Sequence, residues 1–253
     1  MNYVELRKKY VLYRYVAIVL AVICILCTDW MIKNITIKII CILLVNVLLF
    51  FVMLFIKKNY IRAGNKLLHT NLDLISWRQY IEQNKKSHRP IMQMDASLTS
   101  VSYSYMTGDF DAAVKEATES LADIKLKPKY RDFLESYLIR STILARPDLN
   151  REELDDMLND LTITDPMLAD KTKNTSYALH DLTIAHQSND YFEELENEFK
   201  YQQLEITYYQ ALNSKLKGDM TRANELFRIL AQEDEQLYIV QKSKEFLNSE
   251  SIN

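Results

Sequence analysis

The sequence predicts an all-α protein, in which an N-terminal pair of transmembrane helices is followed by an array of helical hairpins. Apolar residues make up 48% of the 253 residues, which excludes a wholly disordered chain. The two longest apolar runs both end before residue 57. Beyond Pro90 the apolar residues recur with helical spacing, and no run of comparable length alternates with the period of a β-strand.

The charged residues are unevenly distributed between these two parts. Residues 1–62 carry nine Lys/Arg and two acidic residues, whereas the rest of the chain carries 22 and 32. The second part is therefore acidic. Nucleic-acid binding requires a basic face, so this balance argues against a nucleic-acid partner.

The N-terminal part begins with a basic segment, residues 1–10, and continues as a transmembrane hairpin, residues 11–56. The stretch IICILLVNVLLFFVMLFI, residues 39–56, has Asn46 as its only strongly polar member. As a helix it extends ~27 Å, close to the ~30 Å of a hydrocarbon core. The run YVAIVLAVICILC, with its apolar flanks, gives the other span, residues 11–31. A cleaved signal peptide is the alternative, but no small-residue cleavage site follows this run.

Basic residues next to the spans predict the orientation of the hairpin. Eight Lys/Arg flank the outer ends of the two spans, and two lie in the connection between them: Arg7, Lys8, Lys9, Arg14, Lys57, Lys58, Arg62 and Lys66 against Lys33 and Lys38. Because cytoplasmic flanks carry the excess of basic residues, both termini are expected in the cytoplasm. The sequence thus predicts a multi-pass protein of the cell membrane, with the lipid bilayer as one partner.

Polar and sulfur-containing residues within the spans have two interpretations. Cys24, Cys27 and Cys41 are all in the apolar runs, where zinc would lack further ligands, and small apolar residues are the simpler interpretation. Asn46, near the middle of the bilayer, would hydrogen-bond to the other span or to a partner helix, or is a tolerated single asparagine.

Residues 57–90 are expected to form a juxtamembrane amphipathic helix that continues from the second span. Apolar residues recur at helical spacing from Ile61 to Ile81. Pro90 ends this segment, because the residue before a proline disfavours helical geometry.

The segment 91–248 is predicted to form successive antiparallel helices, followed by a short tail, 249–253. Breaks are expected at six places, beginning at Gly108, Lys127, Arg146, Asp165, Ser188 and Gly218. The intervening helices have 10–18 residues, so stacked hairpins are the expected arrangement.

Two of the three glycines in the chain begin similar sequences, GDFDAAVKEA at Gly108 and GDMTRANELF at Gly218. A glycine can cap one helix in the left-handed conformation, and the aspartate after it can cap the next helix. The small alanine five residues on, Ala113 or Ala223, allows close approach of the two helices. This pattern resembles the second half of the tetratricopeptide repeat. The resemblance implies an α-solenoid of about four hairpins, and a non-repetitive helical bundle is the alternative.

The resemblance also implies a groove that binds a peptide, lined from the first helix of each hairpin. The family's groove positions lie three, six and thirteen residues before the glycine, with an additional tyrosine here ten before Gly218. They fall on the following residues: Asp95, Ser102, Tyr105, Glu205, Tyr208, Leu212 and Lys215. The alternative for the tyrosines is a place in the core.

Motifs of catalysis, cofactor binding and metal binding are missing from the sequence. His180 and His186 are six residues apart, which does not place them on one helical face, and there is no phosphate-binding glycine loop or G-x-S-x-G. We therefore expect a protein that is not an enzyme and that has no cofactor and no metal.

The expected function is a membrane-anchored adaptor, assembly or regulatory subunit of a transport or secretion complex, which binds a protein or peptide, most simply another membrane protein. The alternative is a bacterial immunity or stress protein that acts through its transmembrane hairpin. Low glycine with abundant Ile, Lys and Asn is typical of AT-rich bacteria.

Overall fold

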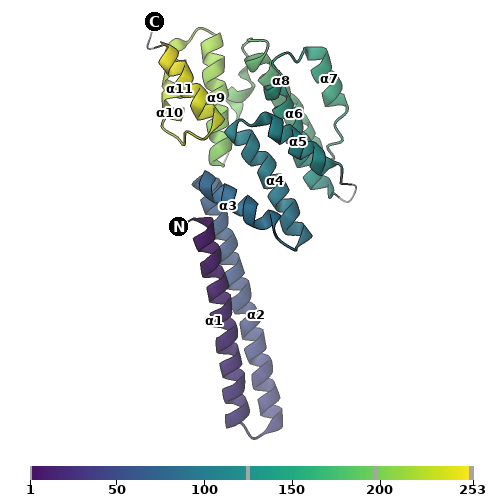
Figure 1. Ribbon diagram of the computed structural model, residues 1–253, viewed down its shortest axis with the longest axis vertical. Coiled ribbons are helices and arrows are strands. Elements are labelled where there is room, and N and C mark those ends of the chain that lie inside the picture. The colour runs from purple at the N-terminus through teal and green to yellow at the C-terminus, as the bar shows by residue number, and fades with distance from the viewer. Residues whose placement is uncertain (1, 124–125, 197–198, 251–253) are drawn as a thin grey trace. The chain divides into compact units, whose positions relative to one another are not determined.

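A computed structural model describes residues 2–123, 126–196 and 199–250 (Figure 1). Every regular element in these ranges is helical and none is a strand, so the predicted all-α class is confirmed. The chain forms two compact units, Met1–Tyr80 and Ile81–Asn253.

The first unit contains the two long helices α1 (Tyr3–Met31) and α2 (Ile35–Asn65), which pack side by side as an antiparallel hairpin (Figure 1). Asn2 and Glu5 form a capping box at the start of α1, and the Asn34 side chain accepts from two backbone N–H groups at the start of α2. Both caps satisfy N–H groups that a helix cannot bond internally.

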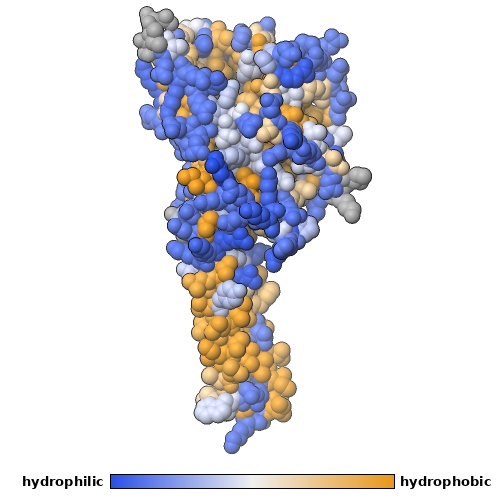
Figure 2. Space-filling model, in the orientation of Figure 1, coloured by the Kyte–Doolittle hydropathy of each residue, from blue (hydrophilic) through white to orange (hydrophobic). Residues whose placement is uncertain are grey.

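Both helices are long and apolar enough to cross a membrane. Most of their large apolar side chains are exposed, and no residue of α2 is buried. Figure 2 shows these apolar side chains as a continuous band over the hairpin. The helices extend past the predicted spans 11–31 and 39–56, because their polar ends continue the same helical turns.

The single amphipathic helix predicted from Ile61 to Ile81 is wrong. The backbone widens into a π-helical turn, η1 (Lys66–Thr70), passes through Leu72 at φ +51°, and resumes as α3 (Leu74–Lys85). Two side chains stabilise this break. The Asp73 carboxylate accepts from the Ser76 N–H at 3.0 Å, and the Trp77 indole donates to the Leu68 carbonyl at 2.7 Å.

The second unit continues as a series of helices, and the six breaks that the sequence predicted lie between them. A further break, at residues 231–237, was not predicted. The elements of this unit are α4 (Pro90–Thr107), α5 (Phe110–Leu121), α6 (Pro128–Ala145), α7 (Arg151–Asn159), α8 (Pro166–Thr183), the 3-10 turn η2 (Asp190–Glu194), α9 (Lys200–Leu216), α10 (Met220–Leu230) and α11 (Tyr238–Glu250). Pro90, Pro128 and Pro166 each begin a helix, where the missing N–H of proline is not needed.

The two glycine turns have the predicted geometry. Gly108 and Gly218 end their helices at φ +84° and +83°, and each following aspartate accepts a backbone N–H of the next helix. Ala113 and Ala223 are completely buried. The hairpins α4–α5 and α9–α10 therefore pack closely at these alanines.

The first helices of the hairpins form an inner layer. Contacts run from α4 to α6, from α6 to α8, and from α8 to α9. Helix α11 then packs on α9 and on α4, so the last hairpin meets the first (Figure 1). Tyr238 of α11 lies edge-on to Phe110 of the first hairpin, with ring centroids 4.9 Å apart.

A candidate binding pocket between α6, α8 and α9

Four of the seven predicted groove residues are buried, and three of them, Tyr105, Tyr208 and Ser102, are core residues for which the groove prediction is wrong. Tyr105 is 1% exposed and Tyr208 is 5% exposed, and Ser102 and Glu205 are also buried. The physical reason is that α11 packs on α4, and that Tyr105 of α4 contacts Glu205 and Tyr201 of α9. These contacts fill the inner face that an open array would leave accessible.

The other three predicted groove residues lie at the surface. Asp95 is exposed near the start of α4, and Leu212 is half-buried on α9. Lys215 is exposed and places its ammonium 4.9 Å from the centre of the Phe246 ring. No hydrogen bond or ion pair joins these three side chains within the described ranges.

A buried polar cluster of Tyr105, Arg140 and Glu205 connects α4, α6 and α9. The Tyr105 hydroxyl donates to Glu205 Oε1 at 2.6 Å and accepts from Arg140 Nη2 at 2.9 Å. Arg140 also forms an ion pair with Glu205, and its guanidinium lies 4.7 Å from the Tyr105 ring centre. One set of contacts thus ties together three helices that are far apart in the sequence.

The environment of this cluster favours a charged arginine and a neutral phenol. Burial disfavours the Arg140 cation, but Glu205, with Tyr105 and Tyr137, outweighs this effect and holds the pKa of Arg140 well above its ordinary value. Burial raises the pKa of the Tyr105 hydroxyl, which the Glu205 charge raises further. The hydroxyl is therefore a hydrogen-bond donor at neutral pH.

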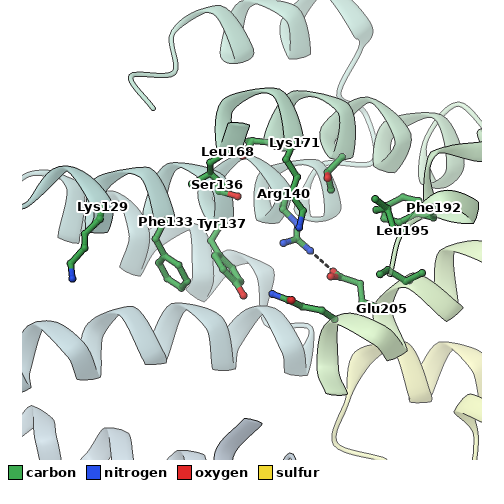
Figure 3. A pocket seen from close by; sticks show the side chains of 14 residues that line it. Lys129, Phe133, Ser136, Tyr137, Arg140, Leu168, Lys171, Phe192, Leu195 and Glu205 are labelled. Atoms are coloured by element: carbon green, nitrogen blue, oxygen red, sulfur yellow. Dashed lines mark hydrogen bonds and ion pairs between the residues drawn. The ribbon is translucent and has the colours of Figure 1, made fainter. Parts of the chain in front are cut away.

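A pocket of about 320 Å³ opens beside this cluster (Figure 3). Its walls come from α6, α8, the segment around η2, and α9. The apolar walls are Phe133, Tyr137, Leu168, Phe192, Leu195 and Ile206, and the polar ones are Lys129, Ser136, Arg140, Lys171, Thr172, Thr175, Gln202 and Glu205. Glu205 is the one predicted groove residue among these lining residues.

Two residues that line this pocket each have a buried polar atom without a protein partner. Arg140 Nε and Thr172 Oγ1 make no hydrogen bond within the described part of the chain, although Thr172 is only 2% exposed. Buried donors are normally satisfied, so such atoms mark places where a water or a ligand completes the bonding. Lys129 and Lys171 are exposed, line the same pocket and add positive charge.

The pocket can therefore hold a side chain or short segment with an apolar body and an oxygen acceptor. Aromatic walls with a few directed polar groups are typical of binding sites. Among the described residues, no three His, Cys, Asp or Glu side chains lie together as metal ligands would.

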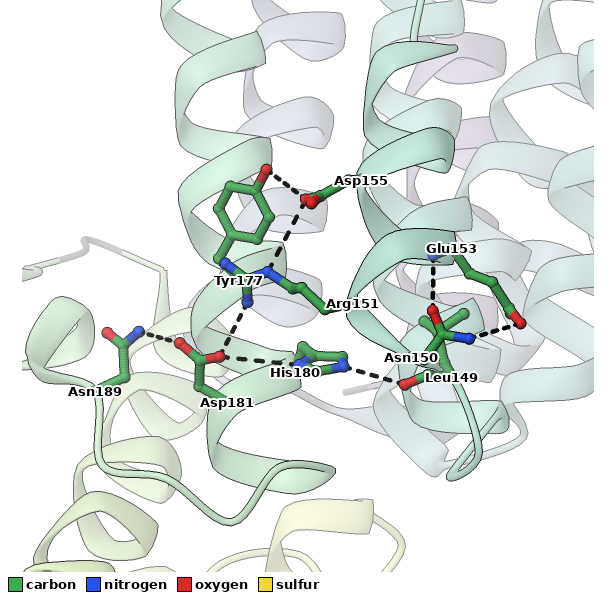
Figure 4. Close-up of polar contacts among 9 residues, drawn as sticks. All are labelled: Leu149, Asn150, Arg151, Glu153, Asp155, Tyr177, His180, Asp181 and Asn189. Carbon is green, nitrogen blue, oxygen red and sulfur yellow. Dashed lines mark hydrogen bonds and ion pairs between the residues drawn. The ribbon is translucent and has the colours of Figure 1, made fainter.

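His180 has a structural place in a second polar cluster, between α7 and α8 (Figure 4). Its Nε2 lies 3.0 Å from the Leu149 carbonyl oxygen. Arg151 binds Asp181 at 3.0 Å and covers the Tyr177 ring at 3.9 Å. These contacts fix α7 against α8 and so support the α8 wall of the pocket.

The α6 residues of the pocket were not predicted as site residues. Phe133, Tyr137 and Arg140 follow one another at spacings of four and three, which places two rings and a guanidinium on one face of α6. This aromatic and basic face is the signal that could have indicated the site.

Asn46 is exposed on α2. Its amide donates to the Ile42 carbonyl of the same helix at 2.8 Å, so the hydrogen bond that the structure shows for it is local and not to α1. A bond to a partner helix stays a prediction.

The chain was compared with models of protein families, with curated proteins and with solved structures, and none of them matches it.

Proposed function

We propose that this protein is a membrane-anchored adaptor that binds a segment of another protein in the pocket between α6, α8 and α9. The observation that carries the proposal is the pair of buried, unpartnered polar atoms, Arg140 Nε and Thr172 Oγ1, in an aromatic-walled pocket. A partner that supplies an acceptor, after a small movement of the atoms that cover Arg140 Nε, would remove the cost of leaving this donor unbonded.

The shape of the array supports a tetratricopeptide-like α-solenoid that has closed on itself. Two of its hairpins, α4–α5 and α9–α10, share the glycine turn, the capping aspartate and the buried alanine. Because α11 meets α4, the peptide site of this array is a side-chain pocket and not a long open groove.

In this proposal the domain formed by α4 to α11 lies in the cytoplasm and performs no catalytic step. Eight basic residues flank the outer ends of the two long helices, against two between them. The domain would then recruit, or hold in an assembly, a partner that works at the inner membrane surface, such as a subunit of a transport or secretion complex.

Two lysines of α8 provide a test with a matched control. Lys171 lines the pocket, whereas Lys173 reaches toward the Tyr177 ring, 5.9 Å away. The two positions are about 200° apart around the helix. A photo-crosslinking amino acid at each position, in full-length protein in native membranes, should yield a discrete protein adduct from 171 alone.

The charge-reversed variants Lys171→Glu and Lys173→Glu extend this test. If Lys171→Glu no longer binds the crosslinked partner and Lys173→Glu still does, the result supports a pocket with a cationic rim. Equal adducts from both positions, or equal retention by both variants, would contradict the proposal.

The runner-up function is action of the hairpin itself in the membrane, as in a bacterial immunity or stress protein. The exposed amide of Asn46 is the observation that favours it. A partner lost from Asn46→Leu but retained by Lys171→Glu would support this function over the pocket.

A further inference from the structure

We propose that the outward face of α2 just beyond its apolar stretch is a binding site for an anionic phospholipid. The site consists of Lys58, Arg62 and Lys66, which surround a shallow hollow completed by Ile61, Asn65 and Thr70. This surface belongs to the first unit, Met1–Tyr80, and does not involve the pocket between α6, α8 and α9.

The three cations form one surface because of their spacing. Lys58, Arg62 and Lys66 are four residues apart, so each is rotated by about 40° from the one before it. All three are exposed. The residues that surround the hollow include no acid, and α2 itself has no Asp or Glu. A ligand at this face therefore meets three positive charges without an internal counterion.

Contacts on the opposite face of α2 hold this surface outward. Tyr60 stacks on Tyr10 of α1 with ring centroids 4.3 Å apart, and its hydroxyl lies 2.8 Å from the hydroxyl of Tyr3. Tyr60 is about 160–200° around the helix from Lys58 and Arg62. Since α1 covers the Tyr60 side, the cationic side is left free to face the surrounding lipid.

Exposed apolar side chains lie next to the cations, toward the middle of the bilayer. The site therefore offers both a cationic and an apolar surface, which match the headgroup and the acyl chains of a lipid. Phe51, Leu54 and Phe55 lie on the same side of α2 as Lys58 and are 60%, 46% and 65% exposed. Acyl chains would lie along these side chains while the phosphate meets the cations. A free phosphate ion would use only the upper half of this surface.

The depth of the cations in a bilayer agrees with this assignment. The apolar stretch ends at Ile56, and Lys58 and Arg62 follow it by about 3 and 9 Å along the helix axis. The headgroup layer of each leaflet is about 5–8 Å thick, and a lysine or arginine can bend toward the phosphates. Lys58 therefore lies within this layer, and Arg62, just beyond it, bends back into it. Lys66, about 15 Å from Ile56, adds its charge from the aqueous side.

The absence of acids on this face favours lipids with net negative charge. In a zwitterionic lipid the headgroup's own ammonium neutralises the phosphate, whereas phosphatidylglycerol keeps its charge. A cation near an anionic surface contributes about a five-fold gain in affinity. Removal of two cations should therefore weaken phosphatidylglycerol binding by about 25-fold.

The test uses the full-length protein in a neutral detergent. Dioleoyl phosphatidylglycerol or dioleoyl phosphatidylcholine is titrated in, and bound lipid is measured by native mass spectrometry. The expected result is saturable binding of phosphatidylglycerol, weaker binding of phosphatidylcholine, and little competition from inorganic phosphate or glycerophosphoglycerol. Equal binding of both lipids, or full displacement by either soluble phosphate compound, would overturn the proposal.

A charge-matched pair of variants localises the site. Lys58→Gln/Arg62→Gln should lose about 25-fold in affinity for phosphatidylglycerol. Lys8→Gln/Lys9→Gln removes two exposed charges from α1 and should lose much less. Equal losses would show a diffuse attraction to a basic membrane flank and would reject a site on α2. Circular dichroism should be unchanged in both, because all four side chains are exposed.

Discussion

The two glycine turns allow a direct test of whether the hairpin array closes on itself. Gly108 and Gly218 have the same backbone conformation, at φ +84° and +83°. A Cβ at Gly218 would meet no atom within 4 Å, whereas one at Gly108 would lie 2.7 Å from Cδ2 of Tyr238 on α11. An alanine at Gly218 therefore introduces backbone strain alone, whereas an alanine at Gly108 introduces the same strain and a steric clash.

The expected magnitudes follow from these contacts. Gly218→Ala should lower the free energy of unfolding by about 1–2 kcal/mol, the strain of a left-handed alanine. Gly108→Ala should cost about 1–3 kcal/mol more, since the turn or Tyr238 has to move. In a domain of this size, that extra cost corresponds to a melting temperature lower by about 2–12 °C.

The assay is urea unfolding of the full-length protein in detergent, followed by far-ultraviolet circular dichroism. A double-mutant cycle with Tyr238→Ala tests the clash. This variant removes Cδ2, the closest atom, but keeps Cβ, 3.0 Å from the added Cβ, so Gly108→Ala should then lose most of its extra cost. Equal costs for the two glycine variants in the presence of Tyr238 would refute the contact of α11 with the first hairpin.

Three further outcomes are expected. Ala113→Leu and Ala223→Leu should each lower the unfolding free energy by about 1–3 kcal/mol, because both alanines are completely buried; unchanged urea midpoints would contradict the close approach of the helices. Burial opposes ionisation of Asp132, but hydrogen bonds from three donors outweigh it and lower its pKa below 3.8. The ionised carboxylate should therefore stabilise the fold fully above pH ~4, and this stabilisation should be lost as the pH falls through the lowered pKa. The difference in urea midpoint between the unmodified protein and Asp132→Ala should narrow only in that acidic range. In a variant without its native cysteines, a cysteine at Asn34 should react with an impermeant thiol reagent on intact cells and one at Gln236 should not; the reverse labelling would contradict the predicted orientation.

Local chemistry made the helices and their ends predictable from the sequence. Pro128 and Pro166 begin helices because their fixed φ suits the first turn, and Gly108 ends one because it tolerates positive φ. Each of these effects acts within a few residues, so a single sequence contains the information needed to place these helix ends.

Side-chain contacts that the apolar pattern does not reveal, some local and some between distant residues, explain what was missed. The break near Leu72 depends on hydrogen bonds of Asp73 and Trp77 that replace helical ones, while the apolar spacing of the segment is compatible with a continuous helix. The burial of Tyr105 depends on Glu205, 100 residues later in the chain. The pocket arises from the same long-range packing, and only Glu205 among its lining residues had been predicted as a site residue.

The buried polar cluster also has a consequence for synthesis of the chain. Glu205 follows its partner Arg140 by 65 residues. At a translation rate of roughly 5–20 residues per second, about 3–13 s pass between the synthesis of the two side chains. Throughout that interval the Arg140 guanidinium has no Glu205 carboxylate to pair with, because Glu205 has not yet been synthesised. The rings of Tyr105 and Tyr137 are not yet covered by α9. A ribosome that stalls before residue 205 therefore carries a domain that cannot complete its core, however well its first hairpins have formed.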